Sequence, residues 1–214
     1  MIDSLLACVS KANESDIYAR LRLDKRADTD TRPDGFARYA LLALHRPSNV
    51  DTRERLLNIL EGLSELKESY SVIFPAHPRT EKRIKEFQLE HHFSWDGEPS
   101  RDARAPDQRD SRIRLIAPLD YIDFLALMKR AALVVTDSGG VQEEATAIQV
   151  PCVTVRNNTE RPVTVHVGAN VLAGTSATGM RAAIRRQCNG EVHGKIPNKW
   201  DGHCAQRILK VLLP

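Results

Sequence analysis

Short apolar runs alternate with longer amphipathic segments along most of the chain. The apolar runs are rich in Val, Ile and Leu and end in polar turns, which is typical of strands buried on both faces of a sheet. The longer segments repeat their apolar residues at helical spacing, as Leu56, Leu60 and Leu63 do. We therefore predict strands at 39–44, 71–74, 113–116, 133–135, 151–155 and 170–173.

Helices are predicted before, between and after these strands. A chain that alternates strand and helix without an internal repeat folds as a Rossmann-like, doubly wound, mainly parallel α/β sheet. Residues 23–35 are polar and predict a linker, and 92–112 predict a mobile surface insertion because they contain almost no apolar residues. The expected helices span 1–22, 52–68, 80–90, 120–131, a segment that begins near 140, 176–187 and 200–212.

The segment that follows the fourth predicted strand carries the clearest candidate binding site. A strand, a turn of small residues and a helix bring free backbone N–H groups and the positive end of a helix dipole together, where they bind phosphate. Gly139 and Gly140 form the turn. Glu144 follows about one helical turn later, where its carboxylate can accept hydrogen bonds from ribose hydroxyls. The alternative is an ordinary turn capped by Ser138 or Asp137.

Other polar residues follow other strands, at the edge where parallel sheets bind their ligands. His45 is a candidate general acid or base, or a donor to phosphate, although a histidine at a strand end is also a common structural residue. Arg46, Arg79 and Arg161 suit phosphate recognition as a group, while each one alone is an ordinary surface charge. Phe124 either stacks on a base or packs in the core. No two carboxylates have a spacing that predicts an acid–base pair.

Composition narrows the class of protein. A length of 214 residues suits one α/β domain, and 42% hydrophobic residues with a net charge of +3 describe a globular protein that does not bind nucleic acid. No window approaches the roughly 18 apolar residues of a membrane span, and there is no signal-peptide pattern. The four cysteines form no C-x-x-C pair and the histidines are scattered, so we expect reduced, mostly buried thiols, a cytoplasmic location and no metal.

Five blocks occur in one order from the first predicted strand to the loop after the fifth. They are His45-Arg-x-x-Asn49-Val, Phe74-Pro-x-His77-Pro-Arg, Pro118-Leu-x-Tyr121-x-x-Phe124, Thr136-Asp-Ser-Gly-Gly-Val-Gln-Glu-Glu144 and Thr159-Glu-Arg-Pro162. Together they resemble the non-hydrolysing UDP-N-acetylglucosamine 2-epimerases, and the Thr-Asp-Ser-Gly-Gly and Thr-Glu-Arg-Pro blocks are the most specific parts.

The resemblance implies a fold and a reaction. Members of that family have two Rossmann-like domains in the glycosyltransferase-B arrangement, with the nucleotide-sugar in the cleft between them. They interconvert UDP-GlcNAc and UDP-ManNAc without a metal or redox cofactor. The accepted scheme removes the C2 proton, eliminates UDP to give a 2-acetamidoglucal, and adds UDP back on the other stereochemical course.

The resemblance also assigns roles to nucleotide-binding residues. It implies that Ser138, Gly139 and Gly140 hold the diphosphate of UDP or UDP-GlcNAc, and that Glu144 holds the ribose. Two further side chains complete this part of the expected site, one bordering the uridine and one pairing with phosphate: Phe124 and Arg161.

The first two blocks carry the remaining expected residues. His45 matches the family's active-site histidine, which would assist the departure and return of UDP, and Asn49 belongs to the same block. Arg46 and His77 match positions that in some bacterial members touch a second, activating UDP-GlcNAc. This sequence has Ser before Asn49 and Val163 after Pro162, where many members have Glu at both places, and it has Ala before Asn170, where Thr is more usual. These departures concern fine specificity and leave the nucleotide contacts intact.

The resemblance covers only half of a family member. Residues 1–35 resemble the family's interdomain helices and linker, and 36–214 its UDP-binding C-terminal domain, so the N-terminal domain with the proton-transferring carboxylates is expected to be absent. Two versions follow: a separate N-terminal-domain polypeptide completes an enzyme, or the chain is a UDP-binding module that catalyses nothing. A glycosyltransferase-like domain is a third alternative. An exposed interdomain surface would favour a homo-oligomer.

Overall fold

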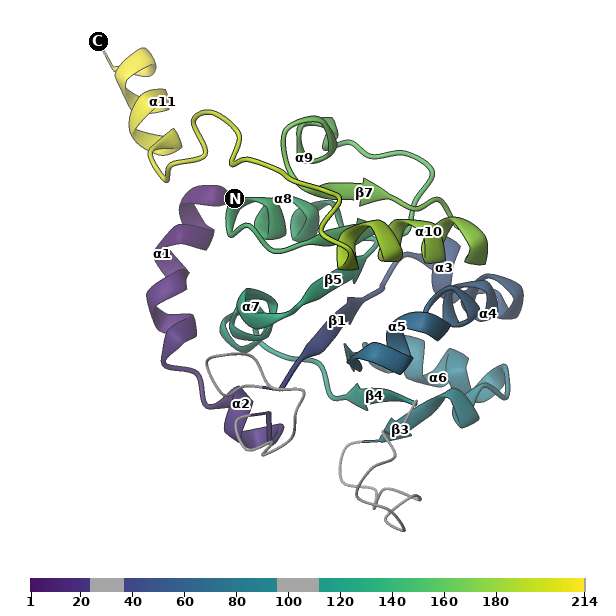
Figure 1. The fold of residues 1–214 in the computed structure, drawn as a ribbon. Helices are drawn as coiled ribbons and strands as arrows, with labels where there is room; N and C mark the ends of the chain where they lie inside the picture. Colours follow the sequence, from purple (N-terminus) through teal and green to yellow (C-terminus); the bar gives the residue numbers. More distant parts are fainter. Residues whose placement is uncertain (24–36, 96–111, 214) are drawn as a thin grey trace.

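The computed structural model describes residues 1–23, 37–95 and 112–213. Its centre is a seven-stranded parallel sheet with the strand order β3-β4-β2-β1-β5-β6-β7 (Figure 1). The predicted Rossmann-like, doubly wound sheet is therefore confirmed. The strands are β1 Tyr39–Ala43, β2 Ser71–Pro75, β3 Phe93–Trp95, β4 Ile113–Ile116, β5 Leu133–Thr136, β6 Cys152–Thr154 and β7 Asn170–Leu172.

The two central strands, β1 and β5, are buried because nearly all of their side chains are apolar. Successive residues point to opposite faces, so Leu42 joins the core on one face of the sheet and Leu41 the core on the other. The register pairs Ala43 with Thr136, so both strands end at the same level. The chain continues from β1 to β2 on one side and later returns to β5 on the other. The carboxyl ends of β1 and β5 are therefore the topological switch point, where such sheets bind ligands.

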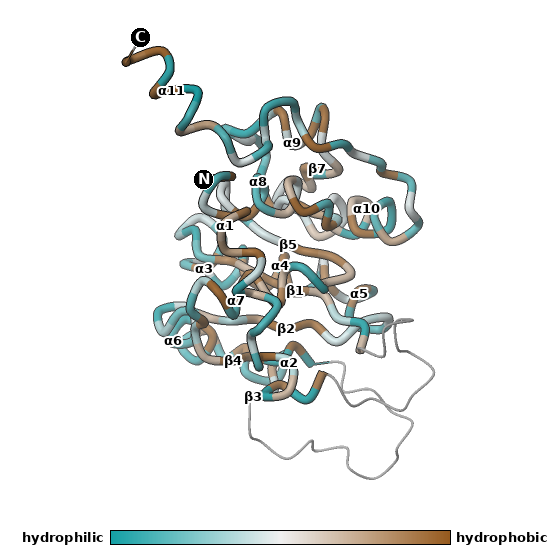
Figure 2. Tube along the Cα trace, turned by 90° about the vertical axis from the view of Figure 1, so that its left-hand side faces the viewer, coloured by the Kyte–Doolittle hydropathy of each residue, from teal (hydrophilic) through white to brown (hydrophobic). Residues whose placement is uncertain are grey.

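Helices cover both faces of this sheet, and hydrophobic segments lie between them (Figure 2). Each helix turns an apolar stripe toward the strands. One layer contains α4 Arg53–Gly62, α5 Ser64–Ser69, α6 Pro78–Glu86 and α10 Ala177–Cys188. The opposite layer contains α1 Ile2–Asn13, α2 Ile17–Arg20, α7 Tyr121–Arg130 and α8 Gly139–Ala147.

The N-terminal helices belong to the same core as the sheet. Leu5 of α1 and Ile17 of α2 are buried with residues of α7 and α8. The predicted pair of helices is thus confirmed, whereas the domain boundary expected at residue 35 lies outside the described residues.

The helix predicted over 52–68 is interrupted. It begins after Thr52, whose Oγ1 accepts a hydrogen bond from the backbone N–H of Arg55, and it divides at Leu63 into α4 and α5. Gly62 packs directly against Met180 of α10: a Cβ added at Gly62 would lie 2.8 Å from the Met180 Cβ atom. The division therefore occurs beside a close approach of two helices.

Several short elements escaped the sequence prediction. The surface insertion expected from residue 92 is wrong for its first residues, because Phe93 is 1% exposed and begins the edge strand β3 after a short 3₁₀ helix. Its remainder, 96–111, lies outside the described residues. Two one-turn helices also occur where loops were predicted. They are α3 Pro47–Val50 and α9 Pro162–His166.

The cysteines are only partly as expected. All four are unpaired thiols. Cys152 is buried in β6, and burial raises the pKa of its thiol to about 12. Cys188 and Cys204 are exposed, so the prediction of mostly buried thiols is wrong. Both of them lie near the ends of C-terminal helices, where less of the sheet is available to cover them.

The C-terminal helix, α11 Cys204–Leu212, projects away from the body of the molecule (Figure 1). Its base is joined to α1 by a 3.0 Å hydrogen bond from the Ala205 backbone N–H to the Asp3 carboxylate. Its apolar side chains face outward, and Val211 is 79% exposed. No helix in the described ranges has the length and apolar character needed to cross a membrane.

We predict that Gly62→Ala destabilises the chain. The added methyl would overlap Met180, and overpacking of this kind costs about 1–3 kcal/mol, more than the roughly 0.5–1 kcal/mol that Ala gains over Gly in a helix. Urea unfolding measures the difference. Glu61→Ala, on the exposed neighbouring position, is the matched control and should leave the unfolding midpoint nearly unchanged. An unfolding midpoint for Gly62→Ala at or above that of the wild type would contradict the packing argument.

Candidate functional site

The loop after β1 and the loop after β5 are joined by one buried carboxylate. Asp137 has no exposed surface. It accepts hydrogen bonds from the backbone N–H of His45 at 3.1 Å, the backbone N–H of Arg46 at 3.0 Å and the side-chain amide of Asn49 at 3.0 Å. The Nδ1 atom of His45 also lies 3.1 Å from Asp137 Oδ1. Asp137 therefore fixes the position of three residues that the sequence marked as candidates.

Asn49 lies under the same loop and is 2% exposed. Its amide also donates to the backbone carbonyl of Val155, at the end of β6, at 3.2 Å. One side chain thus ties the loop after β1 to the residues that follow β5 and β6. The sequence indicated only a turn or cap residue at Asp137 and no partner for Asn49, so these contacts were not predicted.

The turn after β5 leaves space over the first residues of α8. Ser138 is the N-cap residue, as predicted. Neither Gly139 nor Gly140 has a positive φ, and a Cβ added to either would meet no atom closer than 3.7 Å. The nearest side chains are those of Arg161, beside Gly139, and Met1, beside Gly140. Packing in the chain itself does not demand glycine here, so the two residues leave room for a group that approaches the helix N-terminus.

Glu144 is on the buried side of α8, one turn after the glycines. It is 8% exposed, and its carboxylate accepts a 2.9 Å hydrogen bond from the Tyr121 hydroxyl of α7. Burial raises the pKa of Glu144, while the hydrogen bond from Tyr121 acts in the opposite direction. Burial, together with Glu144, also raises the pKa of Tyr121, so the phenol remains a donor at neutral pH.

A buried polar network holds the loop after β6 against α8. The Thr159 hydroxyl donates to Gln142 Oε1 at 2.6 Å, and the Gln142 amide donates to the Ser138 carbonyl at 3.1 Å. Thr159 Oγ1 accepts from the backbone N–H of Arg161 at 3.0 Å. The side-chain amide of Asn170, in β7, also donates to Gln142 Oε1, at 3.4 Å. These contacts fix Arg161 next to the glycine turn.

The arginines around this turn are already paired with carboxylates. Arg156, which is 9% exposed, contacts both oxygens of Glu160, at 2.5 and 2.9 Å. Arg46 reaches Glu160 at 3.2 Å and donates from Nε to the Asp137 carbonyl at 3.0 Å. The hydrogen bond from Arg156 is the main reason why the pKa of Glu160 falls to about 2. Arg156 was not among the sequence candidates, because a single arginine after a strand carries no distinguishing pattern.

Arg161 has a looser environment. Its Nε lies 3.4 Å from the Glu143 carboxylate. This nitrogen atom is buried and makes no hydrogen bond within the described residues, although the side chain as a whole is 43% exposed. A Cβ at Gly139 would be 3.8 Å from this nitrogen. Arg161 is therefore a cation beside the helix N-terminus with unused donor capacity.

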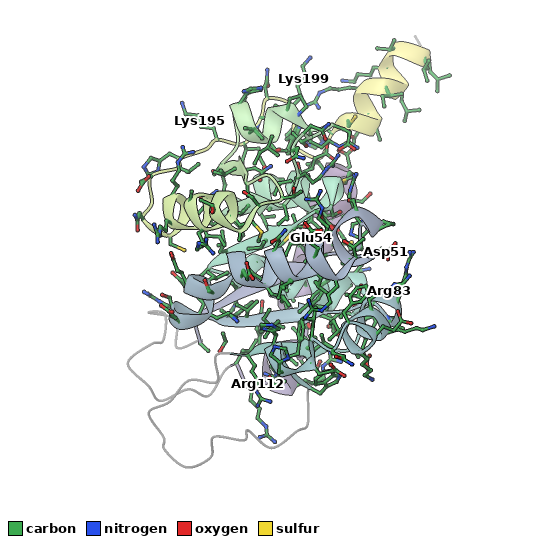
Figure 3. All side chains as sticks on the ribbon, turned by 90° about the vertical axis from the view of Figure 1, so that its right-hand side faces the viewer. Asp51, Glu54, Arg83, Arg112, Lys195 and Lys199 are labelled. Carbon is green, nitrogen blue, oxygen red and sulfur yellow. The ribbon has the colours of Figure 1, made fainter. Side chains whose placement is uncertain are left out.

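Three other candidates lie further from this cluster. His77 follows β2, on the strand next to β1, and caps α6 by accepting the backbone N–H of Arg79 at 3.2 Å. The Arg79 side chain pairs at 2.6 Å with Asp51, which is labelled in Figure 3. Phe124 of α7 is partly buried and packs against the core that α7 and α8 share. The structure thus gathers His45, Arg46, Asn49, Ser138, Gly139, Gly140, Glu144 and Arg161 around the ends of β1, β5 and β6.

The gathered groups combine backbone N–H donors, arginines and a histidine with the carboxylates of Asp137 and Glu144. Among the residues described, no three or more His, Cys, Asp or Glu side chains form a group that could hold a metal ion. Backbone N–H groups, arginines and a histidine at a helix N-terminus are the usual partners of an anion. The site suits phosphate groups with a hydroxyl-bearing neighbour at Glu144.

Fold and site together define a Rossmann-like domain in which backbone N–H groups, arginines and a histidine gather at the switch point of the sheet. A family model described as UDP-N-acetylglucosamine 2-epimerase matches residues 1–213. The chain belongs to the UDP-N-acetylglucosamine 2-epimerase family.

Individual relatives agree with this assignment. The UDP-N-acetylglucosamine 2-epimerase of Methanocaldococcus jannaschii is 45% identical over 176 residues, which cover 81% of this chain and 44% of that protein. The UDP-2,3-diacetamido-2,3-dideoxy-D-glucuronate 2-epimerase of Pseudomonas aeruginosa is 36% identical over 196 residues, covering 87% and 48%. A crystal structure of the Methanocaldococcus jannaschii enzyme in complex with UDP-GlcNAc and UDP matches with a TM-score of 0.71 and 37% identity, over 98% of this chain and 52% of that one. The chain spans about half the length of these relatives.

We predict that Glu160 stays ionised in acid. Because its folded pKa is depressed from 4.5 to about 2, the pairing stabilises the fold above pH 4.5 and is lost as the pH falls through about 2. At pH 3.5, carboxyl NMR should find Glu160 about 95% ionised, against about 10% for an unperturbed Glu.

The Arg156→Gln variant should shift the titration of Glu160 toward the ordinary value, since Arg156 is the main cause of the lowered pKa. Arg185→Gln, on the exposed face of α10, is the control and should leave Glu160 unchanged. A Glu160 that is mostly protonated at pH 3.5 in the folded wild type would contradict the pairing.

Proposed function

We propose that this chain is the UDP-binding part of a UDP-N-acetylglucosamine 2-epimerase. The observation that carries the proposal is the position of Arg161 beside Gly139, at the N-terminus of α8, with Glu144 one turn further on. The diphosphate of UDP binds the Ser138–Gly140 turn and Arg161. The ribose hydroxyls bind Glu144. Phe124, on the helix beside α8, borders the uracil.

The reaction that this site serves is the elimination and return of UDP. A base removes the C2 proton, the C1–oxygen bond breaks with its electron pair going to the UDP oxygen, and the 2-acetamidoglucal remains. His45 donates a proton to the departing phosphate and takes it back when UDP adds again at C1, while C2 receives its proton on the opposite face. Arg46 and His77 lie at the same edge and contact a second nucleotide-sugar. We propose UDP-GlcNAc as the substrate, because the relative with 45% identity is named a UDP-N-acetylglucosamine 2-epimerase. The Pseudomonas aeruginosa relative, with 36% identity, is instead named for a diacetamido uronate.

The site described here supplies one wall of the cleft, so catalysis requires the other wall as well. The exposed apolar face of α11 supports association with another chain, because Ile208, Leu209, Val211 and Leu212 are each more than half exposed. A second copy of this chain is the partner that we propose for this face. A cytoplasmic location stays a prediction from the sequence.

We predict that UDP binds the purified chain with a dissociation constant between micromolar and millimolar, measured by calorimetric titration. Glu144→Gln and Arg161→Gln should each weaken binding by about tenfold or more, because each removes a charged hydrogen-bond partner worth about 1.5–3 kcal/mol. Glu54→Gln, at an exposed position of α4 labelled in Figure 3, is the control.

Equal UDP affinity in Glu144→Gln and wild type would remove the ribose assignment. A folded chain that gives no heat with UDP would mean that this half does not hold the nucleotide by itself, and the proposed binding function would fail.

We predict that the chain self-associates through α11. The apparent mass in light scattering should rise with concentration. The double variant Val211→Asp, Leu212→Asp should remain a monomer, because two charges are placed in the apolar contact. Gln206→Asp with Lys210→Gln changes the net charge of the same helix by the same amount and should still associate. A wild-type mass that stays monomeric at every concentration would refute this surface.

A further inference from the structure

Two exposed histidines follow neighbouring strands at the same edge of the sheet. His45 follows β1 and His77 follows β2. The register pairs Tyr39 with Ser71, so the two strands run level and the histidines occupy equivalent positions. A neutral imidazole has one N–H and one lone pair, and the partner of Nδ1 decides which nitrogen carries the hydrogen. The two rings have opposite kinds of partner.

The partner of His45 is an acceptor. Nδ1 lies 3.1 Å from Oδ1 of Asp137. Asp137 has no exposed surface and accepts N–H groups from His45, Arg46 and Asn49, so its oxygens act as acceptors here. A carboxylate oxygen at that distance favours a hydrogen on Nδ1, because it repels a bare lone pair. Nδ1 therefore carries the hydrogen, and Nε2 is left as a proton acceptor.

The partner of His77 is a donor. The backbone N–H of Arg79 points at Nδ1 of His77 from 3.2 Å, in the N-cap arrangement of α6. This N–H belongs to the first turn of the helix and has no carbonyl partner within the helix. Nδ1 must be unprotonated to accept it, so the hydrogen lies on Nε2. Protonation of Nδ1 would remove the cap.

We propose that the fold holds His45 and His77 in opposite tautomers, with Asp137 as the positioning residue for His45. His45 presents a lone pair at Nε2, because its Nδ1 faces the buried Asp137 carboxylate. It can therefore take up a proton at Nε2 and deliver it. His77 presents an N–H at Nε2 and is a fixed donor to an oxygen atom. The two histidines thus divide proton transfer and binding between them.

This division deepens the proposed function and rests on it for its chemical meaning. His45 enters this step with a proton on both nitrogens: as the C1–oxygen bond breaks, the Nε2 proton passes to a phosphate oxygen of UDP and leaves the neutral Nδ1–H tautomer. When UDP returns, the same proton goes back to Nε2. His77 cannot exchange this role, because a proton accepted at Nδ1 would cost the cap of α6. It contributes a hydrogen bond to phosphate or hydroxyl oxygen.

The test is the nitrogen NMR spectrum of the imidazole rings in the whole chain, without nucleotide, at about pH 8.5, where imidazoles are neutral. His45→Gln and His77→Gln identify the two sets of signals. We expect His45 to have a pyrrole-type Nδ1 and a pyridine-type Nε2, and His77 to have the reverse. Exposed His193 gives the reference pattern of a ring in water.

The Asp137→Asn variant separates positioning from mere packing. The amide keeps the size of the carboxylate and can turn its NH₂ group toward Nδ1, so His45 should shift to the Nε2–H tautomer while His77 stays unchanged. If Asp137→Asn does not fold, the wild-type spectrum still decides. An Nε2–H tautomer at His45, or an Nδ1–H tautomer at His77, would overturn the proposal. Because no nucleotide is present, this result is independent of whether UDP binds.

Discussion

The site depends on the buried carboxylate of Asp137. A charge removed from water is costly unless it is hydrogen-bonded, and Asp137 accepts hydrogen bonds from two backbone N–H groups and one side-chain amide, with His45 Nδ1 3.1 Å away. The groups that satisfy it all come from the loop after β1. That loop is therefore fixed to the end of β5 by the same contacts that make the buried charge tolerable. His45 and the helix N-terminus are brought together as a consequence.

A second constraint is that the cations near the turn are matched by anions. Arg46 and Arg156 share Glu160, and Arg161 lies near Glu143. A phosphate ligand would therefore replace a carboxylate as the partner of an arginine, rather than bind an arginine that has no partner. Arg161 forms the longest of these ion pairs, 3.4 Å from Nε to Glu143, so it is the cation that a phosphate ligand would take over most easily. The overall charge of +3 would not reveal this arrangement, because the charges cancel locally.

The sequence predicted most of the fold because buried parallel strands are continuous apolar runs. The same rule placed His45, Ser138 and Arg161 at one edge, since carboxyl ends of parallel strands meet there. Local sequence patterns gave wrong expectations for residues whose contact partners are far away in the chain. Asp137 has the pattern of a helix cap, and its actual partner loop is about 90 residues away in the chain. The division at Gly62 and Leu63 lies beside a close contact with α10, and no local pattern contains that contact.

The carboxylates of this half explain what the site is unable to do alone. Asp137 is saturated by N–H groups, Glu144 accepts from Tyr121, and Glu160 is held ionised by arginines, with a pKa of about 2. A general base for a carbon acid needs an accessible carboxylate with a pKa nearer to neutrality. None of these three meets that need, whereas His45 can move a proton to and from an oxygen. If the family's reaction is carried out with this chain, removal of the C2 proton falls to a group outside this cluster, and the chain supplies the leaving-group side of the chemistry.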